Sequence, residues 1–220
     1  ENLSKKSFDQ APLSGAGSFF IPFGTKFPNE TDFIRGYGIW GAIDRLGIPA
    51  FLKKEDNESI GFLISHGEVL PRKENRVSLS NKSDQWDIPI PKIEFAWSDN
   101  EFKMIKHMTN TMLKAINCSG GQVKDLKSML KIPFINVIEN NSIALSGEIP
   151  PPGYYIHEVG GAPMGLKEED SVLDKWNRLW RCKNVFVLDG ACWPTSSWQS
   201  PTLTMMAISR RACLGIKKLI

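Results

Sequence analysis

Three pieces between Gly153 and Met206 decide how this chain is organised: YYIHEVGGAPMG (154–165), NVFVLDG (184–190) and WPTSSWQSPTLTMMA (193–207). The first places a histidine, His157, beside a pair of glycines, and glycine lets a backbone approach a ligand closely. The second is an apolar run that ends in Asp189, and the third opens a helix at Pro201. A histidine, an acid at a strand end and a helix amino-terminus in this order predict a proton-transfer site beside an anionic or redox cofactor.

His157 lies where an apolar run, Tyr154 to Ile156, gives way to a tight loop at Gly160 and Gly161. An unperturbed imidazole titrates near neutral pH, which suits a general base. A histidine that only stabilises a glycine turn is the alternative. The segment SGEIPPPG (146–153) contains consecutive prolines, so it is predicted to be a rigid connector that delivers the histidine loop.

The residues after the histidine loop are predicted to supply the cofactor side of the site. Val185 to Leu188 predict a strand buried on both faces, and α/β folds bind ribose or ribityl hydroxyls at an acid that ends such a strand. Capping of the following turn is the equal alternative for Asp189. Pro201 leaves the first amides of the next helix free, and such an end attracts negative charge. The Met and Leu positions of that helix, Met206 and Leu214 among them, are predicted to lie in the core.

GYGIWG (36–41) has the letters of a dinucleotide-binding G-x-G-x-x-G, but its surroundings predict a glycine-bent sheet strand. The fingerprint needs an apolar strand before it and a helix after it. Here the polar stretch NETDFIR (29–35) precedes it, and Gly47 and Pro49 interrupt the segment on its carboxyl side. This stretch is therefore not expected to bind a dinucleotide.

The remaining pattern predicts an α+β fold, a mainly antiparallel sheet backed by helices. Short strands are predicted around 19–23 and over 60–71, 75–80 and 90–97, and the last two show the alternation of half-buried strands. A helix capped by Ser98 or Asp99 is predicted up to Gly120 and laid on the sheet, with His107 a solvated residue of that helix. A shorter helix is predicted over 123–130 and a strand over 132–139.

Composition and charge exclude several classes of protein. The 27 basic and 24 acidic residues are scattered, so neither a nucleic-acid stripe nor a polybasic membrane patch is indicated. No apolar run reaches the roughly 18 residues of a membrane span. The first residues do not have the pattern of a signal peptide. This favours a cytoplasmic location but does not establish one. The spacing of the four cysteines predicts reduced, partly buried thiols and no metal: Cys118, Cys182, Cys192 and Cys213.

Taken together, the motifs resemble the carboxy-terminal half of the glucose-methanol-choline (GMC) flavoprotein oxidoreductases. HEVGGAPMG (157–165) is similar to that family's H-x-x-G-x-x-x-M-G element. NVFVLDGACWPTSS followed by PTLTMMA (184–207) resembles its closing N-L-x-V-x-D-x-S-x-x-P and N-P-x-x-T-x-x-A segments. GEVLPRKENRVSL (67–79) is similar to its G-x-x-x-P-x-x-x-N-R-V-x-L stretch.

The resemblance implies an enzyme that passes hydride from an alcohol carbon to FAD while a histidine takes the hydroxyl proton. His157 would be that base, and Asp189 and Gly190 would lie at the flavin's ribityl chain or pyrophosphate. The backbone that approaches the flavin ring would be Pro201, Thr202 and Leu203. Trp193 and Trp198 would wall the substrate side, with core packing as the equal alternative.

The resemblance also implies two parts: a substrate-binding domain over 1–152, and a catalytic segment over 153–220 whose strand and helix complete an FAD-binding Rossmann-like part. The partner would be the FAD-binding half of the same enzyme, as a separate chain or a missing amino-terminal region, and the substrate a small alcohol. Neither the substrate's identity nor the choice between oxidase and dehydrogenase follows from these residues.

One departure from the family is Ser200, which stands where an Asn or His usually pairs with the first histidine. Serine can donate or accept a hydrogen bond but cannot act as a base, so base duty would fall on His157. A non-catalytic binding module that retains the fold is the second hypothesis. A hydrolase that uses Ser200 or Ser197 with His157 is a third, although no G-x-S-x-G elbow supports it.

Overall fold

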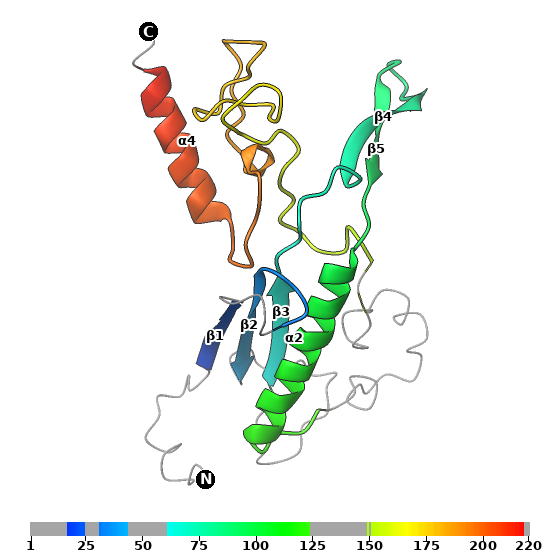
Figure 1. Cartoon of the computed structure of the whole chain (residues 1–220), viewed down its shortest axis with the longest axis vertical. Helices are drawn as coiled ribbons and strands as arrows, with labels where there is room; N and C mark the ends of the chain where they lie inside the picture. Colours follow the sequence, from blue (N-terminus) through cyan, green and yellow to red (C-terminus); the bar gives the residue numbers. More distant parts are fainter. Residues whose placement is uncertain (1–16, 25–30, 44–60, 124–148, 150, 218–220) are drawn as a thin grey trace. The chain divides into compact units, whose positions relative to one another are not determined.

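The computed structural model describes residues 17–24, 31–43, 61–123, 149 and 151–217 (Figure 1). Apart from Val123, the helix and strand predicted over 123–130 and 132–139 lie outside these residues. The chain divides into two compact units. The first contains 1–31, 35–66 and 103–150, and the second contains 32–34, 67–102 and 151–220. The fold is α+β, as predicted, while the domain boundary at residue 152 stays a prediction.

A three-stranded sheet forms the first unit's framework, in the order β1 (Gly17–Gly24), β2 (Gly36–Ile43) and β3 (Gly61–Gly67). β1 and β2 are antiparallel, with Phe19 opposite Gly41. GYGIWG is thus a strand, as predicted, and not a phosphate-binding loop. Its Gly41 is required for space, because a Cβ there would lie 2.5 Å from the Phe62 carbonyl oxygen and 2.9 Å from the Phe19 ring.

The long helix α2 (Asp99–Cys118) lies on this sheet, as its apolar spacing predicted (Figure 1). The Tyr37 hydroxyl on β2 lies 2.8 Å from His107 Nδ1 and donates to Thr111 Oγ1 at 3.0 Å. The prediction of a solvated His107 is therefore wrong: it is one turn from Thr111, on the face of α2 that meets the sheet. Burial raises the pKa of the Tyr37 phenol, although its bond to Thr111 acts in the opposite direction.

Glu101 fastens the start of α2 from within its first turn. Its carboxylate accepts hydrogen bonds from the Ser98 backbone at 2.7 Å, the Ser98 hydroxyl at 2.5 Å and the Leu70 amide at 3.2 Å. The side chain is buried. Burial favours its neutral form, but the bonds from Ser98 and Leu70 outweigh burial and lower the pKa of the carboxyl. Through the Ser98 amide, Glu101 thus satisfies one of the backbone donors that a helix start leaves without an intrahelical partner.

In the second unit, β4 (Arg76–Ser83) and β5 (Pro89–Glu94) form an antiparallel hairpin, and no other described strand pairs with them. The described strands therefore form two sheets instead of one several-stranded sheet. The predicted half-burial is also wrong for Val77, Leu79 and Ile93, which are 62%, 72% and 74% exposed. Their alternation is that of a strand with one apolar face, but the described residues leave that face uncovered.

The carboxy-terminal region differs from the predicted buried strand and core helix. Residues 184–188 form only an isolated bridge, Arg178 to Phe186, and Val185 is exposed. The helix α4 (Thr202–Ile216) follows as predicted, but Met206 and Leu214 are exposed. Met205 and Ile208 pack on the core and Ala212 is buried, so the buried stripe runs along another face of α4. Among the described helices, none is both long and apolar enough to cross a membrane.

Replacing Gly41 by alanine should destabilise the sheet by about 1–3 kcal/mol, since the new methyl group would overlap the Phe62 carbonyl. Gly17→Ala is the matched control, because a Cβ at this strand position meets nothing within 4 Å. Chemical denaturation followed by circular dichroism measures both variants. Equal midpoints for the two would contradict the close approach at Gly41.

Glu101→Gln should destabilise the chain by about 1–3 kcal/mol at neutral pH, because buried donors lose a charged acceptor. The folded pKa of Glu101 is lowered, so its contribution is complete above the carboxyl's unfolded pKa and is lost as the pH falls through the folded pKa. The gap between parent and variant should therefore narrow in acid. Urea midpoints at neutral and acid pH test this. Glu94→Gln, in a surface ion pair, is the control that should leave the midpoint nearly unchanged.

Candidate functional site

The histidine loop is fastened to the turn that follows Asp189. The backbone amides of Gly160, Ala162 and Met164 donate to the carbonyls of Gly190, Ala191 and Cys192, at 3.2, 2.8 and 2.8 Å. Because every second residue of the loop bonds to successive residues of the turn, the two segments run side by side. The histidine loop (154–165) and the residues that follow Asp189 are therefore hydrogen-bonded to each other.

Gly190 makes this meeting possible because it has no side chain. It is buried, and a Cβ at this position would lie 2.9 Å from the Glu158 carbonyl oxygen, 3.2 Å from Met205 Cε and 3.4 Å from Val159 Cγ1. Glu158 follows His157 directly, and Met205 belongs to the first turns of α4. The contact thus joins the histidine loop, the Asp189 turn and α4 at one residue.

Asp189 caps the short 3₁₀ helix η4 (Gly190–Cys192), with its Oδ1 accepting from the Ala191 amide at 2.9 Å. The capping alternative is therefore observed. Its side chain is also exposed and lines an open groove of about 510 Å³. Its role towards a flavin stays a prediction.

The groove brings Asp189 together with Thr202, two residues predicted for the cofactor side. Its lining is mainly apolar: Leu188, Asp189, Thr202, Met205, Met206 and Ser209. α4 begins at its rim with Pro201 as the N-cap residue, and this cap makes no side-chain hydrogen bond. The first backbone bond of the helix runs from the Met205 amide to the Pro201 carbonyl at 2.9 Å. The amides of residues 202–204 precede that bond and face the helix start.

His157 adopts a backbone conformation that non-glycine residues rarely take, with φ at +87°. Its ring is half-buried and meets the edge of Tyr155, with ring centroids 6.4 Å apart. A left-handed conformation of this kind costs about 1–3 kcal/mol and concentrates at functional sites. The imidazole is thus placed at the cost of backbone strain directly before the Glu158–Gly190 contact.

The other predicted site residues do not line this groove. Trp193 is 8% exposed and packs in the core with Leu173 and Cys192, which is the core-packing alternative for its ring. Trp198 is half-buried, and Ser200 and Leu203 are exposed. Within the described part of the chain, no hydrogen bond joins Ser200 to His157. Their roles towards substrate stay predictions.

Three polar side chains that the sequence reasoning missed hold α4 in place beside the groove. Ser209 Oγ donates to the Leu188 carbonyl at 2.9 Å. Arg211 donates to Asn177 Oδ1 at 3.0 Å, and Asn177 Nδ2 donates to the Val187 carbonyl at 3.1 Å. Asn177 is fully buried with φ at +69°, a conformation that asparagine tolerates better than most residues. These bonds join residues that are 10 to 34 positions apart, so no short sequence motif predicts them.

The thiols also differ from the predicted partial burial. Cys192 is fully buried, whereas Cys118, Cys182 and Cys213 are exposed, and all are free. Burial raises the pKa of the Cys192 thiol. Cys192 is therefore a packing residue beneath the Asp189 turn and not a nucleophile.

Gly190→Ala should push the Glu158 carbonyl away and destabilise the chain by about 1–3 kcal/mol. Gly161→Ala is the matched control in the facing loop, because its Cβ would meet only the Ala191 methyl group at 3.8 Å. Thermal unfolding of both variants measures the difference. If Gly190→Ala unfolds at the same temperature as Gly161→Ala, the junction is looser than the contact distances indicate.

Comparison with known proteins places the chain in context. A family model described as GMC oxidoreductase matches residues 71–209. The chain is 27% identical to the 2-methyl-1,2-propanediol dehydrogenase of Mycolicibacterium austroafricanum over 164 residues, 73% of this chain and 26% of that protein. It is 28% identical to the fructose dehydrogenase large subunit of Gluconobacter japonicus over 193 residues, 82% of this chain and 31% of that protein.

The similarity extends to other oxidoreductases. The gluconate 2-dehydrogenase flavoprotein of Pantoea cypripedii is 21% identical, over 99% of this chain and 33% of its own length. The chain thus spans about a quarter to a third of the length of these curated relatives. With the family model covering the hairpin, the histidine loop, the Asp189 turn and the start of α4, the chain belongs to the GMC oxidoreductases, and it corresponds to their carboxy-terminal part.

Proposed function

We propose that this chain is the substrate-binding and catalytic part of an FAD-dependent oxidoreductase that oxidises an alcohol, with His157 as the general base. The observation that carries the proposal is the junction at Gly190. It brings the strained histidine loop, the Asp189 turn and the first turns of α4 together. The junction joins the loop that carries His157 to the Asp189 turn and α4, and these two segments line the groove.

The groove suits a flavin by the chemistry of its lining. Leu188, Met205 and Met206 give it an apolar surface for a flat ring system. The amides at the start of α4 have no side-chain cap and favour negative charge. We assign the Asp189 carboxylate to a ribityl hydroxyl, the Gly190 backbone to the ribityl chain or pyrophosphate, and Pro201, Thr202 and Leu203 to the ring. A bound flavin supplies the acceptor for the hydride that leaves the alcohol carbon.

The chain's own contribution to the reaction is the handling of a proton. His157 accepts the hydroxyl proton as the alcohol carbon is oxidised, and its neutral imidazole is the form that does so. The left-handed backbone at His157, with φ at +87°, is the kind of strained conformation that concentrates at functional sites. Ser200 contributes at most a hydrogen bond, because a hydroxyl is no base at neutral pH.

We propose a small molecule with a CH–OH group as the substrate. Relatives are named for a diol, fructose, paromamine and gluconate, each of which carries hydroxyl groups. Because the chain spans only 26% and 31% of the first two, the flavin-binding region is assigned to further polypeptide, fused or separate. The exposed Ser200 is the observation that favours a second candidate, a binding module without turnover.

His157→Gly separates catalysis from folding. Glycine adopts positive φ without strain, so the variant should be at least as stable as the parent. Loss of the base should nevertheless lower turnover about 10²- to 10⁴-fold. Steady-state alcohol oxidation by the flavin-loaded enzyme, with flavin content read by its visible absorbance, measures both effects. Asp87→Gly relieves a similar φ of +63° in the β4–β5 turn and should leave turnover unchanged.

Undiminished turnover in His157→Gly would rule out His157 as the base. A parent protein that binds flavin and a polyol but never reduces the flavin would favour the binding module instead.

A further inference from the structure

We propose that one face of the β4–β5 hairpin is the seat on which the flavin-binding region of the GMC protein packs. This inference rests on the proposed function, since it concerns the polypeptide that would bring the flavin. We call this surface the apolar face, and it comprises Val77, Leu79, Pro91, Ile93 and Phe95.

Strand geometry places these five residues on one side of the hairpin. Val77 is opposite Ile93, and Leu79 is opposite Pro91. Side chains alternate between the two faces of a strand, so Phe95 shares the side of Ile93 and Pro91. All five residues are exposed. None carries a charge.

The other side of the hairpin carries the charged residues, although the exposed Ile90 also lies on that side of β5. Arg76 is opposite Glu94, and their side chains form an ion pair at 3.1 Å. Lys92 also pairs with Glu94, at 2.9 Å. The hairpin thus has the two-sided pattern of a strand pair that is wet on one face and buried on the other.

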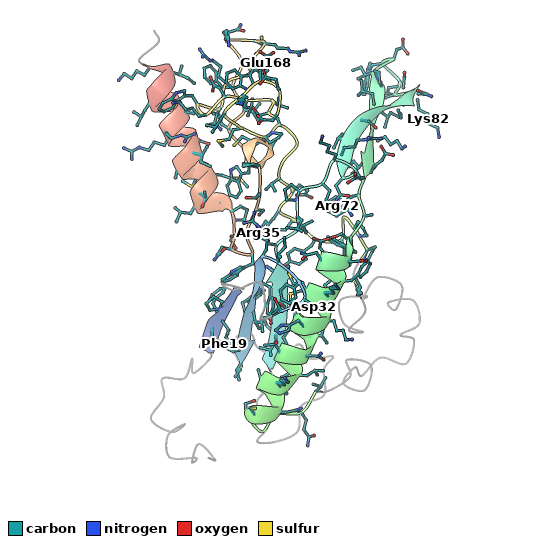
Figure 2. All side chains as sticks on the ribbon, viewed as in Figure 1. Phe19, Asp32, Arg35, Arg72, Lys82 and Glu168 are labelled. Atoms are coloured by element: carbon teal, nitrogen blue, oxygen red, sulfur yellow. The ribbon has the colours of Figure 1, made fainter. Side chains whose placement is uncertain are left out.

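Polar bonds at both ends hold the hairpin in a defined shape. At its base, the Asn75 side chain accepts from the Ala96 amide at 3.0 Å and donates to the Ala96 carbonyl at 3.3 Å, while Arg72 donates to the same carbonyl at 3.1 Å. At its turn, Asp84 accepts from the amides of Trp86 and Ile88 at 2.9 and 3.0 Å. Figure 2 shows Arg72 towards the base and Lys82 towards the tip. The apolar face is therefore pre-organised for binding, which lowers the entropy lost on association.

An isolated two-stranded hairpin is marginally stable in water, and a contiguous exposed apolar face usually marks an interaction surface. Leu79 and Ile93 are 72% and 74% exposed, values that leave most of each side chain in water. An interface made of uncharged apolar residues resembles a permanent contact more than a transient one. The occupant is thus expected to be a constant part of the protein.

The comparisons indicate which polypeptide that occupant is. The matched family region, 71–209, includes the whole hairpin, so the hairpin is an element of the family domain. A hairpin common to the family is expected to pack on a region that is also common to the family, and not on an accessory subunit found with one relative. The relatives extend over about three to four times the length of their match, and that length supplies such a cover. We therefore assign the apolar face to the flavin-binding region, and not to a second copy of this chain.

Cysteine labelling of the complete GMC protein, this chain together with its flavin-binding region, tests the assignment. Ile93→Cys places a thiol on the apolar face, and Lys92→Cys is the matched control one residue away on the polar face. Both positions are exposed here, so shielding by the flavin-binding region should slow iodoacetamide labelling at residue 93 at least tenfold relative to residue 92. Peptide mass spectrometry separates these sites from the exposed native thiols.

A second variant removes the apolar face and keeps the strands. Val77→Thr, Leu79→Thr and Ile93→Thr together place a β-branched residue of high strand propensity at each position but lose apolar area. The complete protein should then release its flavin at a temperature lower by at least about 5 °C. Ser78→Thr, on the opposite face of β4, should leave that temperature unchanged. Flavin fluorescence during heating measures both variants.

Equal labelling rates at residues 92 and 93 in the complete protein would overturn the proposal, as would an unshifted release temperature in the triple variant. Shielding that disappears on dilution, together with dissociation of dimers in sedimentation, would also overturn it and assign the face to a second copy. A protein that shields residue 93 and holds flavin but oxidises no alcohol would contradict the proposed function and leave this inference standing.

Discussion

The absence of a side chain at Gly190 is the constraint on which the candidate site depends. The Glu158 carbonyl oxygen, Met205 and Val159 all occupy space that a Cβ at this position would need. In close packing of this kind, the position of one segment determines the positions of its neighbours, because a protein interior is hard to compress. The loop that carries His157, the turn that follows Asp189 and the first turns of α4 therefore have one common point of reference. None of these three segments by itself would identify the site.

Polar bonds extend this junction along α4. Ser209 fixes the helix to the Leu188 carbonyl, and Arg211 reaches the Val187 carbonyl through buried Asn177. A buried amide such as that of Asn177 is costly unless it is hydrogen-bonded, and here both ends of the amide are used. These bonds set the separation between α4 and segment 185–188, and the groove is lined from both. Groove geometry is thus fixed from residues outside the recognisable motifs.

Sequence reasoning succeeded where the determinant is local. Helix α2, the strand at GYGIWG and the start of α4 follow from apolar period, glycine spacing and Pro201. It failed where the determinant is distant in the chain. His107 was assigned to solvent because Tyr37, its partner at 2.8 Å, lies 70 residues away. Residues 184–188 have strand composition but form only one bridge here, since a strand needs a neighbouring edge that composition does not encode. The φ of His157 likewise has no signature in residue type.

For five large aliphatic side chains, the sequence predicts burial and the structure shows exposure. Val77, Leu79 and Ile93 on the hairpin, and Met206 and Leu214 on α4, were assigned to protected positions and are exposed. A periodic apolar pattern shows which large side chains share one side of a helix or strand. Their burial also depends on what packs against that side, and this is decided by contacts between segments that are distant in the sequence. The alternation of Val77 and Leu79 therefore follows from local sequence, whereas their exposure does not.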